Sequence, residues 1–270
     1  MQEREQMFAH ERQERILSIL RRDKKVFVRD LCELLSVSAV TVRNDLRELE
    51  ERRALIRTHG GAIPYSNTGF EENTADKNTK KVAEKQAIAK EAAKYVSDGD
   101  TVAIDTGTTA FEFARALTKK KDLTVVTNDV RIALYLDENS DASVILIGGF
   151  LRRGYNCNIG PIAEESLRNL FMDKCFIATN GLTVSAGATT PNADQASVKR
   201  MMVEHSNQVI LMCDGDKFGR NSLVSFAPVE NLHKIITDEG ARGQELSAIE
   251  ALGVEVILAP TDKNCIIKLS

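Results

Sequence analysis

A chain of 270 residues, 43% of them apolar, is long enough for about two domains that each bury a core. No apolar run approaches the roughly 20 residues that span a bilayer, and residues 1–14 lack the apolar segment of a secretory signal, so we expect a cytoplasmic protein that does not bind membranes. The net charge is −3, but residues 1–63 are weakly basic and the remainder is acidic. This asymmetry permits nucleic-acid binding by the N-terminal part.

The cysteines and histidines are too scattered to suggest metal binding. The five cysteines include no Cys-x-x-Cys pair, and none of the four histidines has a second potential ligand at helical spacing. An odd number of widely separated cysteines also argues against a disulfide framework. We therefore expect reduced thiols, no metal and no cofactor. The residues concerned are Cys32, Cys157, Cys175, Cys213, Cys265, His10, His59, His205 and His233.

Three short helices are predicted in the N-terminal part. Residues 11–22 carry an apolar stripe at helical spacing, and a polar break with a short apolar bridge separates them from a second helix over 28–35. A tight turn that ends at Ser38 precedes the third helix, which spans 39–52. Ser38 is a good N-cap because its hydroxyl accepts from an amide of the first turn.

The third helix has two different faces. Val42, Leu46 and Leu49 recur at the spacing of a buried stripe. The opposite face carries hydrogen-bonding side chains near the N-terminus, the end that a recognition helix inserts into the major groove, where Arg suits guanine and Asn suits adenine. These predicted DNA contacts are Ser38, Thr41, Arg43, Asn44 and Arg47.

A basic hairpin is predicted after the third helix. Residues 54–56 are apolar, as in a short strand, and Gly60-Gly61 is typical of a hairpin tip. Arg57 and His59 flank this tip, as charges do in a wing that contacts the DNA backbone, so we add Arg57, His59 and Gly60 to the predicted interface. A plain three-helix bundle with a solvated charged face explains each charge alone, but the helix, turn and wing together favour DNA binding.

The N-terminal motifs resemble the DNA-binding signature of the DeoR family of bacterial regulators. The resemblance lies in Ser-Ala-Val-Thr-Val-Arg-Asn-Asp-Leu over residues 38–46 and in Arg-Thr-His-Gly-Gly-Ala over 57–62. Asn44 replaces a common second Arg, and Arg53 replaces a Gly that often ends the helix. The resemblance implies a mainly α winged helix-turn-helix domain, which we place over 1–63, that binds double-stranded operator DNA.

The composition changes twice after residue 63. Residues 64–81 are rich in Asn, Thr, Glu and Lys and are predicted to form a linker. A helix is predicted over 82–96, and short apolar runs then alternate with helices, which indicates an α/β domain with a mainly parallel sheet over 82–270. The predicted strands are 101–104, 123–126, 143–147, 175–178, 208–212, 234–236 and 254–258.

Polar residues follow these strands, and ligands of parallel sheets bind beyond the carboxyl ends of strands. Residues 105–109, Asp-Thr-Gly-Thr-Thr, lie between the first strand and a helix predicted over 110–117, so small side chains and helix amides favour a phosphate there. Such a turn can merely cap a helix, and lysines 199 and 217 can be solvated surface residues. The predicted effector contacts are Asp105, Gly107, Thr108, Thr109, Asn128, Gly149, Asn180, Lys199 and Lys217.

The segment from about residue 82 onward also resembles the DeoR-family sensor domain. The resemblance implies a fold similar to ribose-5-phosphate isomerase and a phosphorylated sugar as effector. It also implies that Asp105, Gly107, Thr108 and Thr109 line the effector site, with Lys217 nearby. The matching motifs are Asp105-x-Gly107-Thr108-Thr109, Gly148-Gly149, Asn158-Ile159-Gly160, Asn180-Gly181-Leu182, Lys199-Arg200 and Lys217-Phe218-Gly219.

Three classes of function are compatible with these features. The resemblance implies a transcriptional regulator, by the family's default a repressor of a carbohydrate-utilisation operon, that works as a homo-oligomer (dimer or tetramer) and is released by a phosphorylated sugar. The alternative is an isomerase-like enzyme with a fused DNA-binding head. The isomerases carry acidic residues where this chain has residues 179–183, which contain none, although Asp105 and Asp214 remain as possible bases. A head that binds another protein is disfavoured by the donor-rich third helix. We therefore expect binding without catalysis.

Overall fold

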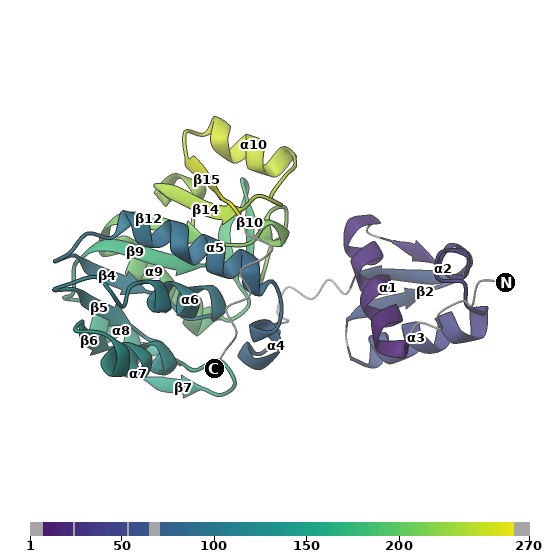
Figure 1. Ribbon diagram of the computed structural model, residues 1–270, viewed down its shortest axis with the longest axis horizontal. Coiled ribbons are helices and arrows are strands. Elements are labelled where there is room, and N and C mark those ends of the chain that lie inside the picture. The colour runs from purple at the N-terminus through teal and green to yellow at the C-terminus, as the bar shows by residue number, and fades with distance from the viewer. Residues whose placement is uncertain (1–7, 24, 53, 65–70, 262–270) are drawn as a thin grey trace. The chain divides into compact units, whose positions relative to one another are not determined.

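The computed structural model describes residues 8–23, 25–52, 54–64 and 71–261, and it divides into two compact units, Met1–Asn67 and Thr68–Ser270 (Figure 1). The boundary between the units falls inside the segment 64–81 that the sequence predicts as a linker. Residues 1–7, Arg53, the linker residues 65–70 and Cys265 lie outside the described residues, so what the sequence predicts for them stays a prediction.

The N-terminal unit combines three helices with a small antiparallel sheet of strand order β1-β3-β2, the architecture of a winged helix-turn-helix. Its elements are α1 (Ala9–Asp23), β1 (Val26–Phe27), α2 (Val28–Leu35), α3 (Ala39–Glu51), β2 (Leu55–Thr58) and β3 (Gly61–Pro64). One core joins the helices to the sheet, and its buried side chains include Ile16, Leu31, Val42, Leu46 and Leu55. The predicted helices and hairpin are thereby confirmed to within a few residues.

A buried ion pair fixes the third helix of this unit. Arg12 of α1 binds the carboxylate of Asp45 on α3 through two nitrogens, with Nε–Oδ2 at 2.5 Å and Nη2–Oδ1 at 2.9 Å. Gln13 adds a hydrogen bond from its amide to Glu48 on α3 at 2.6 Å. A forked guanidinium–carboxylate contact restricts orientation as well as distance, so α1 sets the rotation of α3 about its axis.

The C-terminal unit is built on a seven-stranded sheet whose strands run parallel in the order β15-β14-β12-β9-β4-β5-β6. The strands are β4 (Thr101–Ile104), β5 (Thr124–Thr127), β6 (Ser143–Leu146), β9 (Met172–Ala178), β12 (Ser206–Met212), β14 (Lys234–Asp238) and β15 (Glu255–Ala259). All seven correspond to the apolar runs of the sequence, which confirms the predicted α/β class. The edge strand β6 differs from the expectation of burial on both faces, because Ile145 and Leu146 are exposed.

Helices cover both faces of this sheet (Figure 1). Successive strand residues alternate between the two cores: Phe176 packs against the helices of one face, whereas Cys175 and Ile177 pack against those of the other. None of the helices in the described ranges has the length and apolar character of a membrane-spanning segment. The first face carries α5 (Val82–Ala92), α6 (Thr108–Ala116) and α7 (Val130–Asn139), and the second carries α8 (Pro161–Leu167), α9 (Ala193–Glu204) and α10 (Gln244–Ala251).

Several short elements were not predicted from the sequence. A hairpin pairs β7 with β8, and β10, β11 and β13 form a three-stranded antiparallel sheet. The end of the predicted linker contains a short helix. The bounds are α4 (Thr74–Asn78), β7 (Phe150–Arg152), β8 (Cys157–Ile159), β10 (Gly181–Thr183), β11 (Gly187–Thr190) and β13 (Val224–Ala227), with 3₁₀ turns at Ala93–Tyr95, Gly215–Lys217 and Val229–Asn231.

Leu46→Ala should destabilise the N-terminal unit strongly, because Leu46 is 1% exposed and its truncation leaves a cavity in a small core. We expect a loss of about 2–5 kcal/mol in the free energy of unfolding, measured by urea denaturation with circular dichroism. Val40→Ala is the control, since Val40 lies on the same helix but is 65% exposed. Equal effects of the two substitutions would contradict this assignment of the buried face.

Candidate functional site

The N-terminus of α3 presents the predicted DNA contacts. The Ser38 hydroxyl accepts a hydrogen bond from the Thr41 amide at 3.1 Å, which confirms Ser38 as the N-cap. Arg43, Asn44 and Arg47 are exposed on the side of α3 that faces away from the core. The structure therefore places these residues where a recognition helix needs them, and their contact with DNA stays a prediction.

The wing is tied to α3 by an ion pair. Arg57 of β2 donates from Nε to Oε2 of Glu50 at 2.7 Å, and its backbone amide donates to Oε1 at 2.9 Å. His59 and Gly60 are exposed at the hairpin tip, where Gly60 has a φ of +87° that favours glycine. A side chain at Gly61 would lie 2.0 Å from the Val26 carbonyl oxygen, so glycine permits β3 to approach β1.

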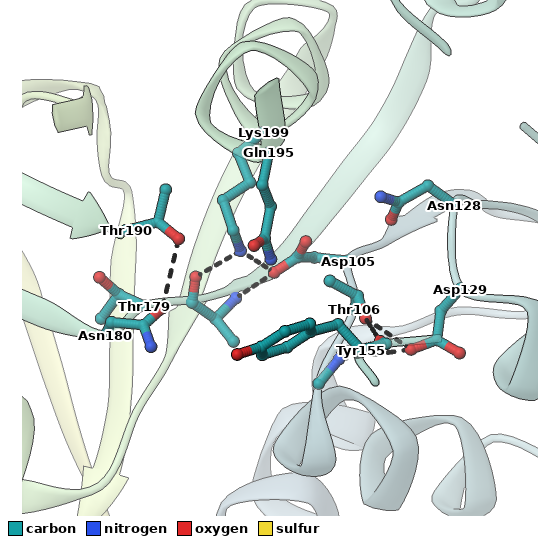
Figure 2. A network of polar contacts seen from close by, with 12 residues as sticks. Asp105, Thr106, Asn128, Asp129, Tyr155, Thr179, Asn180, Thr190, Gln195 and Lys199 are labelled. Carbon is teal, nitrogen blue, oxygen red and sulfur yellow. Dashed lines mark hydrogen bonds and ion pairs between the residues drawn. The ribbon is translucent and has the colours of Figure 1, made fainter. Parts of the chain in front are cut away.

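A buried ion pair lies at the carboxyl ends of the central strands of the C-terminal unit. Asp105 follows β4, and its Oδ2 contacts the ammonium of Lys199 from α9, which is 2% exposed (Figure 2). Lys199 also donates to the carbonyl oxygen of Ala178 at 3.0 Å, and the Ala178 amide donates to Asp105 at 3.1 Å. The structure thus brings together two predicted effector contacts that are far apart in the sequence, and their contact with an effector stays a prediction.

The loop 105–109, here called the cradle loop, is held by Asp129, the N-cap residue of α7. The Thr106 hydroxyl donates to Oδ2 of Asp129 at 2.6 Å, and the Gly107 amide lies 3.4 Å from the same oxygen (Figure 2). Burial raises the pKa of Asp129, although Thr106 and nearby backbone amides counteract that effect. Gly107 is the N-cap of α6, and it provides no side chain to cap the helix. The first amides of α6 therefore keep the orientation that favours an anion.

Asn128 and Gly149 stabilise the β7–β8 hairpin. The Asn128 side-chain amide donates to the carbonyl oxygen of Asn158 at 3.0 Å. Gly149 has a φ of +135°, and a side chain there would lie 2.7 Å from the carbonyl oxygen of Ile159. Both predicted effector contacts thus have a structural role, and their contact with an effector stays a prediction.

Asn180 lies in the loop between β9 and β10, and Lys217 lies in the 3₁₀ turn that follows β12. The Asn180 side chain accepts from the Thr190 hydroxyl at 3.3 Å. Lys217 lies 3.4 Å from the Asp214 carboxylate, which Lys81 also contacts at 3.2 Å. These lysines hold the pKa of Asp214 below its ordinary value, although burial opposes them. Lys217 is therefore engaged by a carboxylate of this chain.

Sequence reasoning missed a second group of charged residues at this edge. Glu71 accepts hydrogen bonds from Lys77 and Arg152, each at 2.7 Å, and its own carbonyl oxygen accepts from the Tyr155 hydroxyl at 2.8 Å. Arg152 also donates to Gln195 on α9 at 2.7 Å. Burial alone would raise the pKa of Glu71, but Lys77 and Arg152 hold it below its ordinary value. A polar linker composition gives no signal for such a contact.

Three thiols among the described residues of the C-terminal unit, those of Cys157, Cys175 and Cys213, are buried. Burial raises the pKa of Cys157 to about 12 and also raises the pKa of Cys175 and Cys213, so these thiols stay protonated near neutral pH. Over the described residues, no three His, Cys, Asp or Glu side chains are arranged to hold a metal ion.

Two family descriptions match this chain, in two separate segments. Residues 12–68 match the DeoR-like helix-turn-helix domain, and residues 80–239 match the DeoR C terminal sensor domain. The chain is 39% identical to the HTH-type transcriptional regulator GlpR of Haloferax volcanii, over 93% of this chain and 98% of that protein. It is 36% identical to the putative aga operon transcriptional repressor of Escherichia coli O157:H7, over 92% of this chain and 93% of that protein.

Among solved structures, the chain aligns with ribose 5-phosphate isomerase A from Methanocaldococcus jannaschii. The two are 16% identical, and the alignment has a TM-score of 0.38 and covers 50% of this chain and 53% of that chain. This likeness is too weak to carry an argument about activity. The α/β class of the C-terminal unit rests on its own parallel sheet.

Lys199→Met should destabilise the C-terminal unit by about 3–5 kcal/mol, because it leaves the buried Asp105 carboxylate without its cation. The double variant Asp105→Asn with Lys199→Met should be less destabilised than the sum of the two single variants. Urea denaturation of the full chain with circular dichroism measures both effects. Additive losses in the double variant would show that the two side chains are not coupled.

Proposed function

The chain belongs to the DeoR family of DNA-binding transcriptional regulators, and on this premise we propose that it represses a carbohydrate-utilisation operon until a phosphorylated sugar releases it from operator DNA. The observation that carries the proposal is that a DNA-binding segment and a sensor segment of one chain both match the family. The relative named as a putative aga operon repressor supports the sign of regulation. Such a regulator acts in the cytoplasm, where it meets both DNA and sugar phosphates.

The effector phosphate binds at the cradle loop in this proposal. Gly107, Thr108 and Thr109 offer backbone amides and hydroxyls at the N-terminus of α6, whose dipole favours an anion. Asp105, Asn128, Asn180 and Lys199 surround the sugar, and Lys217 lies beside it. Two buried oxygens, Asp105 Oδ1 and Asn128 Oδ1, have no hydrogen-bond partner among the described residues. Sugar hydroxyls are donors that suit such acceptors.

In this proposal the protein binds the phosphorylated sugar and does not convert it. Proton transfer beside a carbonyl needs a carboxylate free to accept a proton. Asp105 is held by Lys199 and the Ala178 amide, and Asp214 is held by Lys81 and Lys217. The loop 179–183 after β9 contains no acid. These engaged carboxylates support a role in ligand binding rather than in catalysis.

In this proposal the protein works as a homo-oligomer, a dimer or a tetramer. Paired recognition helices then bind operator half-sites that are spaced by whole helical turns of the DNA. The C-terminal unit carries large apolar side chains exposed on and beside its edge strand β6. They support association of copies, since an unpaired, apolar strand edge favours contact with another chain. These side chains are Leu134, Ile145, Leu146, Phe150 and Leu151.

Arg43→Ala should weaken operator binding by about 1–3 kcal/mol and leave effector binding unchanged, because Arg43 is exposed near the N-terminus of α3 and suits a guanine edge. Fluorescence anisotropy with an operator fragment measures this, and wild-type affinity should fall steeply with salt. Arg168→Ala, which removes the same charge from the C-terminal unit, is the control. Equal affinity of Arg43→Ala and wild type would exclude this face as the interface.

Thr108→Ala should bind operator normally and require about tenfold more effector for release, since one hydrogen bond to a charged group is worth at least that factor. The effector is the sugar phosphate that raises the melting temperature most in a thermal-shift screen. Thr118→Ala at the other end of α6 is the control; its hydroxyl binds only the Arg115 carbonyl oxygen among the described residues.

Release of Thr108→Ala at the wild-type effector concentration would show that the cradle loop does not bind the phosphate. The same sugar phosphates, incubated with the wild-type protein and followed by NMR, should give no product. Catalytic turnover would overturn the assignment as a sensor without enzymatic activity.

A further inference from the structure

The carboxylate of Glu71 is bound as a ligand anion would be. Its Oε1 accepts from Lys77 at 2.7 Å and from the Asn180 side-chain amide at 3.2 Å, and its Oε2 accepts from Arg152 at 2.7 Å. The Glu71 side chain is only 5% exposed. Donors from three separate segments therefore converge on one carboxylate, which is the arrangement of an oxyanion receptor.

This receptor adjoins the candidate effector site. Arg152 donates to Gln195, which lies with Lys199 on α9. Tyr155 links the two regions, because its hydroxyl donates to the Glu71 carbonyl oxygen while its own carbonyl oxygen accepts from Thr106 in the cradle loop. Figure 2 shows Tyr155, Asn180 and Gln195 around Asp105 and Lys199. Glu71 therefore lies next to residues that would contact the effector in the proposed site.

The cations of the receptor need an anion. The side chains of Lys77 and Arg152 are only 27% and 17% exposed. Burial of either positive charge without a nearby negative charge would therefore cost free energy. Burial lowers the pKa of Lys77, and Glu71 opposes that shift. Burial also lowers the pKa of nearby Lys85 to about 8, with Lys77 and Lys217 adding repulsion. Glu71 can leave at low cost only when another anion takes its place.

We propose that Lys77, Arg152 and Asn180 form an oxyanion subsite that Glu71 fills from within the chain, and that an oxyanion of the effector displaces Glu71 on binding. This inference rests on the proposed function, which supplies the effector. The displacing group is a second oxyanion of the effector, distinct from the phosphate at the cradle loop. It is another phosphate or a sugar carboxylate, because the two share the acceptor geometry that these donors match.

Displacement of Glu71 acts on the segment that leads to the DNA-binding unit. Glu71 follows closely after Asn67, where the N-terminal unit ends. The segment 71–80 is also held by the Thr74 amide, which donates to the Gly154 carbonyl oxygen at 3.1 Å, and by Lys85, which donates to the carbonyl oxygens of Lys77 and Lys80. When the effector anion replaces Glu71, the segment 71–80 would lose the contacts of the Glu71 side chain. Effector binding would thereby be coupled to the segment that connects the C-terminal unit with the N-terminal unit.

The test compares Glu71→Gln with Glu72→Gln in the full chain. Glu72 is the matched control, because its contact with Lys80 is an exposed ion pair. Isothermal titration calorimetry with inorganic phosphate and with gluconate, each on its own, distinguishes the two sources of the oxyanion. Glu71→Gln should bind one of these probes at least about tenfold more tightly than wild type, and Glu72→Gln should not. Unchanged affinity of folded Glu71→Gln for both probes would overturn the proposal.

Hydrogen exchange of the wild-type protein gives a second test that needs no variant. Saturating probe should raise amide exchange over residues 71–80, because Glu71 has been released. Protection of residues 71–80, or no change in their exchange, would refute displacement. Release of the wild-type protein from operator DNA by a sugar phosphate tests the proposed function separately, so that function can hold even where displacement of Glu71 fails.

Discussion

The buried contact between Lys199 and Asp105 is the interaction on which the C-terminal unit depends. It joins α9 to the end of β4, and the Ala178 backbone at the end of β9 contributes to the same cluster through two hydrogen bonds. Removal of two charges from water is compensated only when further polar partners satisfy them. One helix and two neighbouring strands are consequently held in a single relative position. The positions of the polar groups at the carboxyl edge of the sheet therefore depend on this ion pair.

The N-terminal unit is also held by a buried ion pair, that of Arg12 with Asp45. Arg12 and Asp45 are separated by 33 residues in the sequence, and Lys199 and Asp105 by 94. In both units a helix remote in the chain fixes a functional element through a buried pair of opposite charges. Apolar packing alone tolerates small rotations of a helix, whereas charge-assisted hydrogen bonds are directional. The helix α3 and the carboxyl edge of the central sheet are therefore each held by contacts that are more directional than apolar packing.

Sequence reasoning succeeded where the chemistry is local. The seven strands were found because continuous β-branched runs are typical of a sheet buried on both faces, and Ser38 was found because N-caps depend on neighbours within one turn. The strands β7, β8, β10, β11 and β13 were missed, since they are only three or four residues long and several are built around Gly and Thr. Glu71 was missed because its partner Arg152 lies 81 residues away, and no pattern within a polar linker encodes that distance.

The ion pair between Arg57 and Glu50 has a consequence for the search along a genome. In the proposed interface, a DNA phosphate would compete for Arg57 with a carboxylate of its own chain. In that interface, this competition would lower the affinity of the wing for every DNA sequence alike, whereas the proposed base contacts of α3 would keep their full value at the operator. Because chromosomal DNA offers an immense excess of competing sites, weaker contact everywhere means that less protein is held at the wrong place. In this proposal, Glu50 would favour faster location of the operator at the expense of tighter binding.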